Sequence, residues 1–309
     1  MIRKANEIPK NEKYKGLLYG QPGVAKSTTA LSAPNPLMID VDRGWTRIPA
    51  QFRTGAYIQP ATYDEVLEDL RDPAQLREYE TIIFDTCGAL LELMKPWAIK
   101  QNPKNGQRDG TTLSMQGYGT VGKEFARLAA YCHGMNKHVI YVAHSKEKQD
   151  GDITTNRLDI EGSTKDAVWK VLDFGGFIEP VGENRSIGFS PVERYFAKGA
   201  RGITGTMLIP NVMKGQPNTF ITDLFHQMDK AGAEEQTMGE EYKLLMDSLK
   251  KQIELVTTAQ QATECLSFIS TTKHIFASQT EAKYLLADKT KSLGLTYDKA
   301  KVVFVAKGE

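Results

Sequence analysis

Long hydrophobic runs are missing from this sequence, and no stretch approaches the roughly 18 consecutive apolar residues of a membrane-spanning helix. Residues 1–15 also lack the apolar core of a secretory signal peptide. Both absences predict a cytoplasmic protein with no membrane partner.

Cysteine is scarce, and neither sign of charge is in excess. The three cysteines, Cys87, Cys132 and Cys265, lie far apart, which predicts a reduced compartment without a disulfide framework. No cysteine and histidine spacing resembles a zinc site. The formal net charge is +1, so any nucleic-acid contact must come from a local basic patch.

What is present suits one large or two ordinary globular domains, with 309 residues of which 40% are hydrophobic. Near-continuous apolar runs, typical of parallel strands covered on both faces, occupy residues 15–20, 36–42, 81–86 and 138–145. Helix signals lie between them, including a capping box at Thr62 and Glu65 and an apolar face at Phe125, Leu128, Ala129 and Cys132. This alternation predicts an α/β fold with a mostly parallel sheet.

The pattern changes after about residue 175. Residues 176–191 predict two strands around a turn, and residues 192–202 a further strand-like run, which together indicate an antiparallel extension at the sheet edge. Residues 226–241 are polar and predict a linker. The remainder predicts helices, with capping boxes at Thr258 and Ser278 and a stop at Gly294. We therefore expect a core at residues 1–229 and a small C-terminal helical domain at residues 230–309.

A phosphate-binding loop is predicted between the first strand and the next helix. The pattern G-x-x-x-x-G-K-[ST] is met except that alanine replaces its second glycine, and the expected nucleotide contacts are Gly20, Gln21, Pro22, Gly23, Val24, Ala25, Lys26, Ser27 and Thr28. Lys26 is expected to reach the β- and γ-phosphates of ATP, and the Ser27 hydroxyl to bind Mg²⁺. Because alanine is tolerated at position 25, we expect an ordinary φ there and room for one methyl group.

Polar residues at other strand ends complete the expected site. Asp85 ends an apolar strand and is expected to hold the Mg²⁺ shell. Thr86 follows it, where hexameric ATPases of the helicase-loader type have glutamate, so the base must lie elsewhere. Asp42 is the candidate base and Asp40 the second choice, although an aspartate at a strand end often serves a turn. His144 is placed to contact the γ-phosphate, or else is a partly buried structural histidine.

Together, these motifs resemble the RecA-like P-loop ATPases, and more narrowly the phage proteins of the Sak-type single-strand annealing and recombinase group. The resemblance covers roughly residues 14–215 and departs in having Asp42 where the family base is glutamate. It implies ATP-dependent assembly of a homo-oligomeric ring or filament on single-stranded DNA, in phage recombination or replication. It also implies the host cytoplasm, and a single-strand-binding protein or another recombination protein as a partner.

Two further groups of basic residues are candidates for contacts with DNA or with a neighbouring subunit. Residues 95–123 combine basic and aromatic side chains, which suits single-stranded DNA, and the candidates are Lys100, Lys104, Arg108 and Tyr118. The alternative is that this stretch is a solvated glycine-rich loop with no role in DNA binding. Lys198 and Arg201 are candidates to reach the γ-phosphate of the next subunit, because RecA-like ATPases complete their sites at subunit interfaces. A solvated basic turn or a DNA contact is the alternative.

The leading interpretation is a DNA-dependent ATP hydrolase. The alternatives are a nucleotide-gated oligomeric scaffold with little turnover and a helicase-like replication ATPase. A small-molecule phosphotransferase is the weakest, because no arginine-rich lid follows Asp85.

Overall fold

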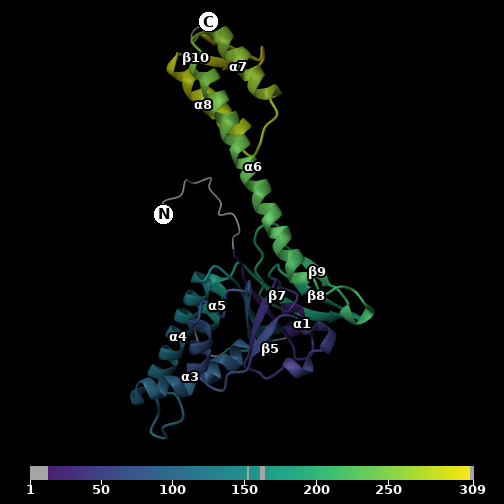
Figure 1. Cartoon of the computed structure of the whole chain (residues 1–309). Helices are drawn as coiled ribbons and strands as arrows, with labels where there is room; N and C mark the ends of the chain where they lie inside the picture. The colour runs from purple at the N-terminus through teal and green to yellow at the C-terminus, as the bar shows by residue number, and fades with distance from the viewer. Residues whose placement is uncertain (1–12, 152, 161–163, 307–309) are drawn as a thin grey trace. The chain divides into compact units, whose positions relative to one another are not determined.

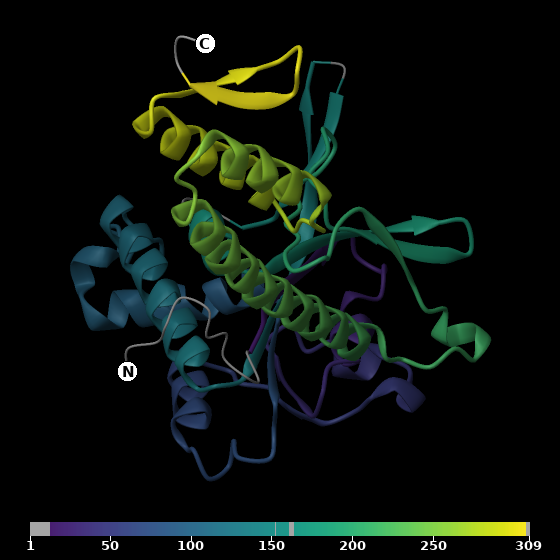
Figure 2. The same ribbon diagram turned by 90° about the horizontal axis from the view of Figure 1, so that it is seen from above.

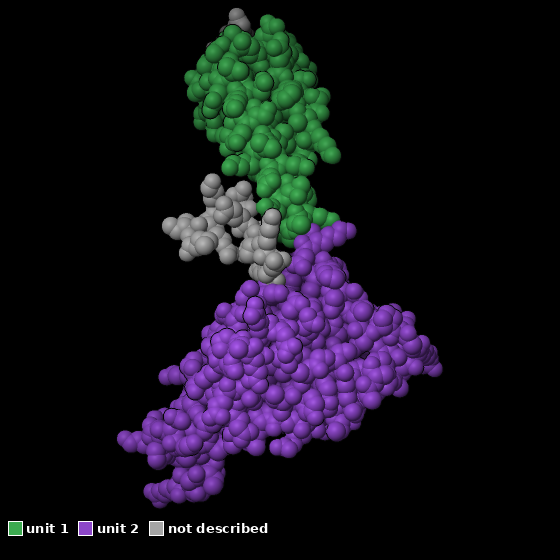
Figure 3. Space-filling model, viewed as in Figure 1, with its two compact units in different colours: residues 1–9, 231–309 green, residues 10–230 purple. Residues whose placement is uncertain are grey.

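The computed structural model describes residues 13–151, 153–160 and 164–306. These residues form two compact units, which divide between Lys230 and Ala231 (Figure 3). The first unit below is the part up to residue 230, purple in Figure 3, and the second unit is the part from residue 231, green in Figure 3. None of the helices in these ranges is both long and apolar enough to cross a membrane.

Strands and helices alternate along the first unit (Figure 1). The described strands of both units are β1 (Lys15–Gly20), β2 (Pro36–Asp40), β3 (Ala56–Ile58), β4 (Thr81–Asp85), β5 (His138–Asp150), β6 (Ile153–Leu158), β7 (Phe174–Val181), β8 (Asn184–Gly188), β9 (Thr206–Ile209), β10 (Leu295–Asp298) and β11 (Val303–Ala306). The α-helices are α1 (Lys26–Ala30), α2 (Tyr63–Arg71), α3 (Cys87–Gln101), α4 (Met115–Gly134), α5 (Thr164–Val171), α6 (Phe220–Glu254), α7 (Ala259–Thr271) and α8 (Ser278–Ser292). Short 3₁₀ helices occupy Trp45–Arg47, Ala50–Phe52, Pro103–Asn105 and Val212–Lys214.

One large sheet organises the first unit. Its described strands follow the order β3-β2-β4-β5-β1-β7-β8-β9, and β6 pairs with β5. In this order, β3, β2, β4, β5, β1 and β7 run parallel to one another, whereas β8 and β9 are each antiparallel to the preceding strand. The predicted α/β fold with an antiparallel edge extension is therefore confirmed. The strand expected at residues 138–145 is longer than predicted, and it turns back into β6 to form a projecting hairpin (Figure 2).

Two apolar layers cover the sheet because successive residues of a strand face opposite sides. Leu17 and Phe84 belong to the layer that α2, α3, α4 and α5 complete. Leu18 and Ile83 belong to the opposite layer, with α1 and the start of α6. The near-continuous apolar strands therefore reflect burial on both faces. Parallel pairing brings the carboxyl ends of β1, β2 and β4 to one edge, together with His144 of β5.

Residues 192–202 do not form the expected strand. They make only isolated bridges, including one between Lys198 and Gly175, and the third strand of the extension is β9. A Cβ at Gly199 would lie 1.9 Å from the carbonyl oxygen of Ile203, and Arg201 has a φ of 50°. The chain therefore folds back on itself tightly here, which prevents a continuous ladder.

The linker expected at residues 226–241 is instead part of α6. The helix runs unbroken from Phe220 to Glu254. Phe225 and Met228 in its first turns are buried, whereas the following polar residues are mostly exposed. Alanine, glutamate, glutamine and lysine are good helix formers, so Gly232 and Gly239 do not end the helix. The polarity indicates a solvated helix and not a linker.

The second unit packs the end of α6 with α7 and α8 around an apolar core that includes Leu249, Ile269 and Leu286. The capping box at Thr258 and the stop at Gly294, where φ is 67°, are as predicted. The capping box at Ser278 is wrong, because α8 begins at Ser278 itself and its hydroxyl accepts from the Ile275 amide. The hairpin of β10 and β11 is also absent from the sequence-based prediction, which was entirely helical.

Candidate nucleotide-binding site

The loop from Gly20 to Lys26 joins the carboxyl end of β1 to α1, as the motif requires. A Cβ at Gly20 would lie 2.4 Å from the carbonyl oxygen of Ile178 on the neighbouring strand β7, so glycine is needed for close strand packing. Gly23 has a φ of 83° and open space around it. The loop is therefore held against the sheet at its start and is open to a ligand at its middle.

Ala25 adopts the left-handed conformation, with φ 60° and ψ 34°. The prediction of an ordinary φ is therefore wrong. The Ala25 carbonyl accepts hydrogen bonds from the amide and the hydroxyl of Thr29, so the first turn of α1 starts from this left-handed residue. A left-handed conformation costs an L-residue roughly 1–2 kcal/mol, which explains why the motif usually has glycine here.

Lys26 is buried at the start of α1. Its ammonium donates to the carbonyl oxygens of Gly20 (3.1 Å) and Gln21 (2.9 Å). Burial lowers the pKa of Lys26 to about 8, and the charges of Asp85 and Asp42 oppose this shift. The ammonium thus donates to two neutral carbonyls, which phosphate oxygens can replace.

Asp85 ends β4 and is buried beside Ser27. Burial raises its pKa to about 6, whereas a hydrogen bond from Ser27 lowers it. Asp40 and Asp42 add their negative charges and raise it further. A hydroxyl beside a buried carboxyl short of positive charge is a donor set that suits Mg²⁺.

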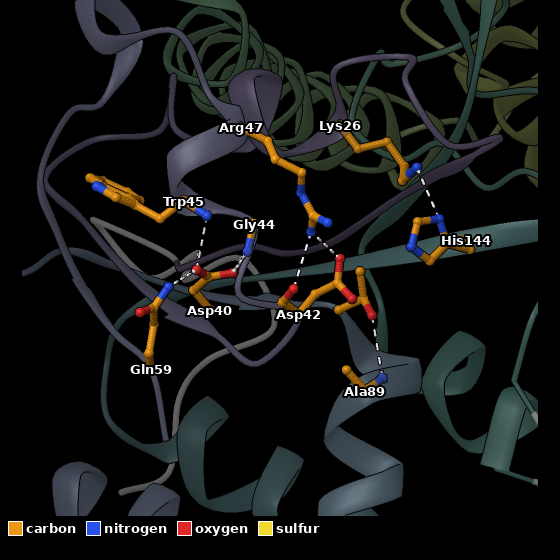
Figure 4. A network of polar contacts seen from close by, with 10 residues as sticks. Lys26, Asp40, Asp42, Gly44, Trp45, Arg47, Gln59, Ala89 and His144 are labelled. Carbon is orange, nitrogen blue, oxygen red and sulfur yellow. Dashed lines mark hydrogen bonds and ion pairs between the residues drawn. The ribbon is translucent and has the colours of Figure 1, made fainter. Parts of the chain in front are cut away.

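Asp40 and Asp42 have different surroundings, although they are two residues apart. The Asp40 carboxylate is buried and accepts from the amides of Gly44 (2.7 Å) and Trp45 (2.9 Å) and from Gln59 (2.7 Å), so it organises the turn after β2 (Figure 4). Asp42 faces the cavity and pairs with Arg47, with 2.5 Å between Oδ2 and the guanidinium. Of the two candidate bases, only Asp42 lines the site.

His144 lies on β5, between β4 and β1, as its proposed role requires. Its Nδ1 atom is 3.5 Å from the Lys26 ammonium (Figure 4). Burial and the charge of Lys26 lower the pKa of His144, so the neutral imidazole is favoured. A neutral ring here can form a hydrogen bond with a ligand that displaces the Lys26 ammonium.

These residues surround a cavity of about 590 Å³. Its polar end contains Lys26, Ser27, Thr28, Asp42, Asp85 and His144. The other lining side chains include an apolar group, Ile48, Pro49, Phe52, Val212 and Met213. The size and the division into polar and apolar walls suit a ligand with a charged and an aromatic part.

Arg47 and Arg185 also line this cavity, and neither was predicted from the sequence. The sequence offered one indication for Arg47, which is that it follows the candidate base Asp42 by five residues. Arg185 carried no signal, because β8 pairs with β7 and only this pairing brings it near the phosphate loop.

A second cavity of about 910 Å³ shares Asp42, Thr86 and His144 with the first. Residues of α3 and α4 complete it, including Leu91, Val121 and Tyr118. Tyr118 is one of the predicted DNA contacts and is 41% exposed. A ligand in this second cavity would therefore lie next to the polar end of the first.

The basic DNA candidates lie on the connection between α3 and α4 (Figure 1). Lys100 lies in the last turn of α3 and pairs with Asp64 at 2.9 Å. Lys104 and Arg108 are exposed. These three cations and Tyr118 belong to one helical hairpin, but Tyr118 alone of the four lines a described cavity.

Lys198 and Arg201 lie away from the phosphate loop of their own chain. Lys198 bridges to Gly175 near the start of β7, and its ammonium donates to the Leu172 carbonyl. The Arg201 guanidinium lies 5.8 Å from the ring centre of Tyr14, just before β1. Both are thus at the amino ends of the parallel strands, whereas the phosphate loop follows a carboxyl end.

A family model described as an AAA domain matches residues 12–200, which is more than half of the chain. The matched span contains the phosphate loop, Asp42, Asp85 and His144. No curated protein matches the chain.

Proposed function

Because the chain belongs to the AAA domain family, we propose that its 590 Å³ cavity binds ATP with Mg²⁺ and that the protein hydrolyses this ATP. The main supporting observation is the joint burial of Lys26 and Asp85 at one end of the cavity. A buried ammonium and a buried carboxyl that do not neutralise each other directly match a phosphate chain and its metal ion.

The nucleotide would lie along the cavity with its phosphates on the loop. The amides from Gly23 to Thr28 would face the phosphates at the start of α1, and the base would lie against Ile48, Phe52 and Met213. Ser27 and Asp85 would hold Mg²⁺, which would neutralise charge on the phosphates. The raised pKa of Asp85 supports this role, because burial and the charges of Asp40 and Asp42 outweigh the effects of Ser27 and Lys26, and a metal ion would relieve that imbalance.

Asp42 would act as the base that orients and deprotonates the attacking water. Its carboxylate lines the polar end of the cavity, while Asp40 is fully engaged in the turn. His144 would report the γ-phosphate, since it lies beside Lys26 and lines both cavities. Lys26 would leave the carbonyls of the loop and bind the β- and γ-phosphates.

At a finer level, we propose a Sak-type recombinase or annealing ATPase that assembles as a homo-oligomer on single-stranded DNA. Tyr118 supports this, because an aromatic ring beside the second cavity would connect DNA bases to the γ-phosphate sensor. Residues 230–309 would form a separate C-terminal domain that contacts a recombination partner. A scaffold with negligible turnover is the second candidate, and the observation that favours it is the pairing of Asp42 with Arg47.

ATPase activity measured with and without single-stranded DNA tests the proposal. Lys26→Ala should abolish nucleotide binding and turnover while circular dichroism and the melting temperature stay near wild type. Lys250→Ala, an exposed lysine on α6, is the matched control and should leave both activities unchanged. Nucleotide affinity equal in wild type and Lys26→Ala would refute the site. ATP binding without hydrolysis would favour the scaffold, and hydrolysis that DNA does not stimulate would refute the finer proposal.

A further inference from the structure

Arg47 is the cation closest to the proposed base. Its guanidinium donates to the Asp42 carboxylate at 2.5 Å and to the Asp42 backbone carbonyl at 3.1 Å (Figure 4). The Arg47 side chain is 65% exposed and the Asp42 side chain 38%. An ion pair as exposed as this one is weak, so a stronger anion can take Arg47 from Asp42.

The backbone that carries Arg47 is held in place. Asp40 accepts from the amides of Gly44 and Trp45, and the Trp45 ring stacks on Tyr57 with 4.3 Å between ring centres. Arg53 donates to the carbonyl oxygens of Thr46 and Ile48 on the other side. The backbone of Arg47 is therefore fixed, and only the side chain needs to move for the guanidinium to reach another partner.

The cavity offers a second position for the Arg47 guanidinium. Arg47 lines the same cavity as Lys26, Ser27 and His144, where the phosphates would lie. Its charge also lowers the pKa of His144, which shows that the two side chains are within electrostatic reach. A γ-phosphate carries more negative charge than Asp42 and offers several acceptor oxygens, so it would compete well for a planar guanidinium.

We propose that Arg47 exchanges partners when ATP binds: it leaves Asp42 for the γ-phosphate, and this frees the Asp42 carboxylate to act on water. In the empty protein the ion pair blocks the base. With ATP bound, Arg47 contacts the phosphate that is to be cleaved. With ADP there is no γ-phosphate, and Arg47 returns to Asp42. The inference rests on the proposed ATPase function and adds a cation from the same chain that distinguishes ATP from ADP.

In this proposal Asp42 and the γ-phosphate compete for the Arg47 guanidinium. If Asp42 holds Arg47 away from the nucleotide, then Asp42→Asn should strengthen binding of a non-hydrolysable ATP analogue by about two- to fivefold, the range of an exposed ion pair. Arg47→Gln should weaken binding of the analogue by about tenfold and leave ADP affinity within about twofold. In the double variant, Asp42→Asn should give no gain, because the cation it releases is gone.

Binding of fluorescent ATPγS and ADP to the full chain, measured for these four proteins, tests the exchange. Arg53→Gln is the matched control, because it removes an arginine that supports the same turn without lining the cavity. Arg47→Lys should recover part of the ATPγS preference. Equal losses for ATPγS and ADP in Arg47→Gln, the same losses in Arg53→Gln, or additive effects in the double variant would each overturn the inference. Lys26→Ala separates the two claims: if it loses both nucleotides while Arg47→Gln changes the affinities for ATPγS and ADP equally, only the exchange fails.

Discussion

Position 25 places a left-handed alanine directly before the lysine of the phosphate loop. We expect Ala25→Gly to raise the free energy of unfolding by about 1 kcal/mol, because the relief of roughly 1–2 kcal/mol of strain exceeds the entropic cost of glycine. Urea denaturation measures this change. Ala126→Gly, an exposed position within α4, is the control and should lower stability by about 1 kcal/mol. A loss at both positions would mean that Ala25 is not strained.

Asp85 predicts a pH dependence of stability in the nucleotide-free protein. Burial raises its pKa from 3.8 to about 6, so between these values the unfolded chain has lost a proton that the folded chain keeps. The contribution of Asp85 to stability is therefore present below about pH 4 and is lost as the pH rises through 6. Asp85→Asn cannot titrate, and its stability relative to wild type should increase across this window and then level off.

Denaturation curves at several pH values, in EDTA and without nucleotide, give this comparison. Asp109→Asn is a useful contrast, since hydrogen bonds from Thr112 lower the pKa of that exposed carboxyl. Its stability relative to wild type should decrease with rising pH. Parallel pH profiles for wild type and Asp85→Asn would show that the Asp85 carboxyl is not destabilised by burial.

At the scale of elements, the connection between α3 and α4 carries the proposed DNA contacts. Replacement of Lys100, Lys104 and Arg108 by alanine should weaken single-stranded DNA binding and reduce the slope of log affinity against log salt by about 2, if each cation contacts one phosphate. Fluorescence anisotropy across a salt series measures both. The matched control replaces the exposed lysines Lys243, Lys250 and Lys251 on α6. Equal effects in the two triple variants would place the DNA path elsewhere.

The element α6 shows how a local pattern can mislead. Its middle is polar and contains glycine, so the sequence predicted a linker at residues 226–241. Buried residues in the first unit hold one end of the helix, and buried residues in the second unit hold the other. Tertiary packing of its ends stabilises a helix whose middle has no apolar face, and packing of this kind is not encoded in a short window of sequence.

At the scale of the whole molecule, the prediction concerns assembly. Lys198 and Arg201 lie at the opposite end of the sheet from their own phosphate loop, so they could reach a γ-phosphate only in another copy. Lys198→Ala or Arg201→Ala should keep ATP affinity and lose turnover. Mixing either variant with Lys26→Ala should restore part of the activity, because each copy supplies what the other lacks.

The mixing experiment needs assemblies that are shown to contain both variants, for example by two affinity tags. Arg194→Ala, an exposed arginine in the same loop that pairs with Glu179, is the control and should keep full turnover. No recovery of activity at any mixing ratio would remove Lys198 and Arg201 from the site and leave Lys26, Arg47 and Arg185 as the cations of the cavity.

Local sequence alone determined where the apolar parallel strands lie in the chain and that the phosphate loop follows β1. It also determined that Asp85 ends one strand and that His144 belongs to another. These features depend on short-range chemistry: burial on both faces of a strand requires continuous apolar residues, and a loop that binds phosphate requires small residues before lysine. Only the tertiary structure decided the roles of Asp40 and Asp42, since their difference lies in which amides and which cavity each one faces. It also brought Arg185 to the site, because the pairing of β8 with β7 joins segments that no short window of sequence connects. The left-handed geometry of Ala25 likewise came only from the structure, since the sequence predicted an ordinary φ there.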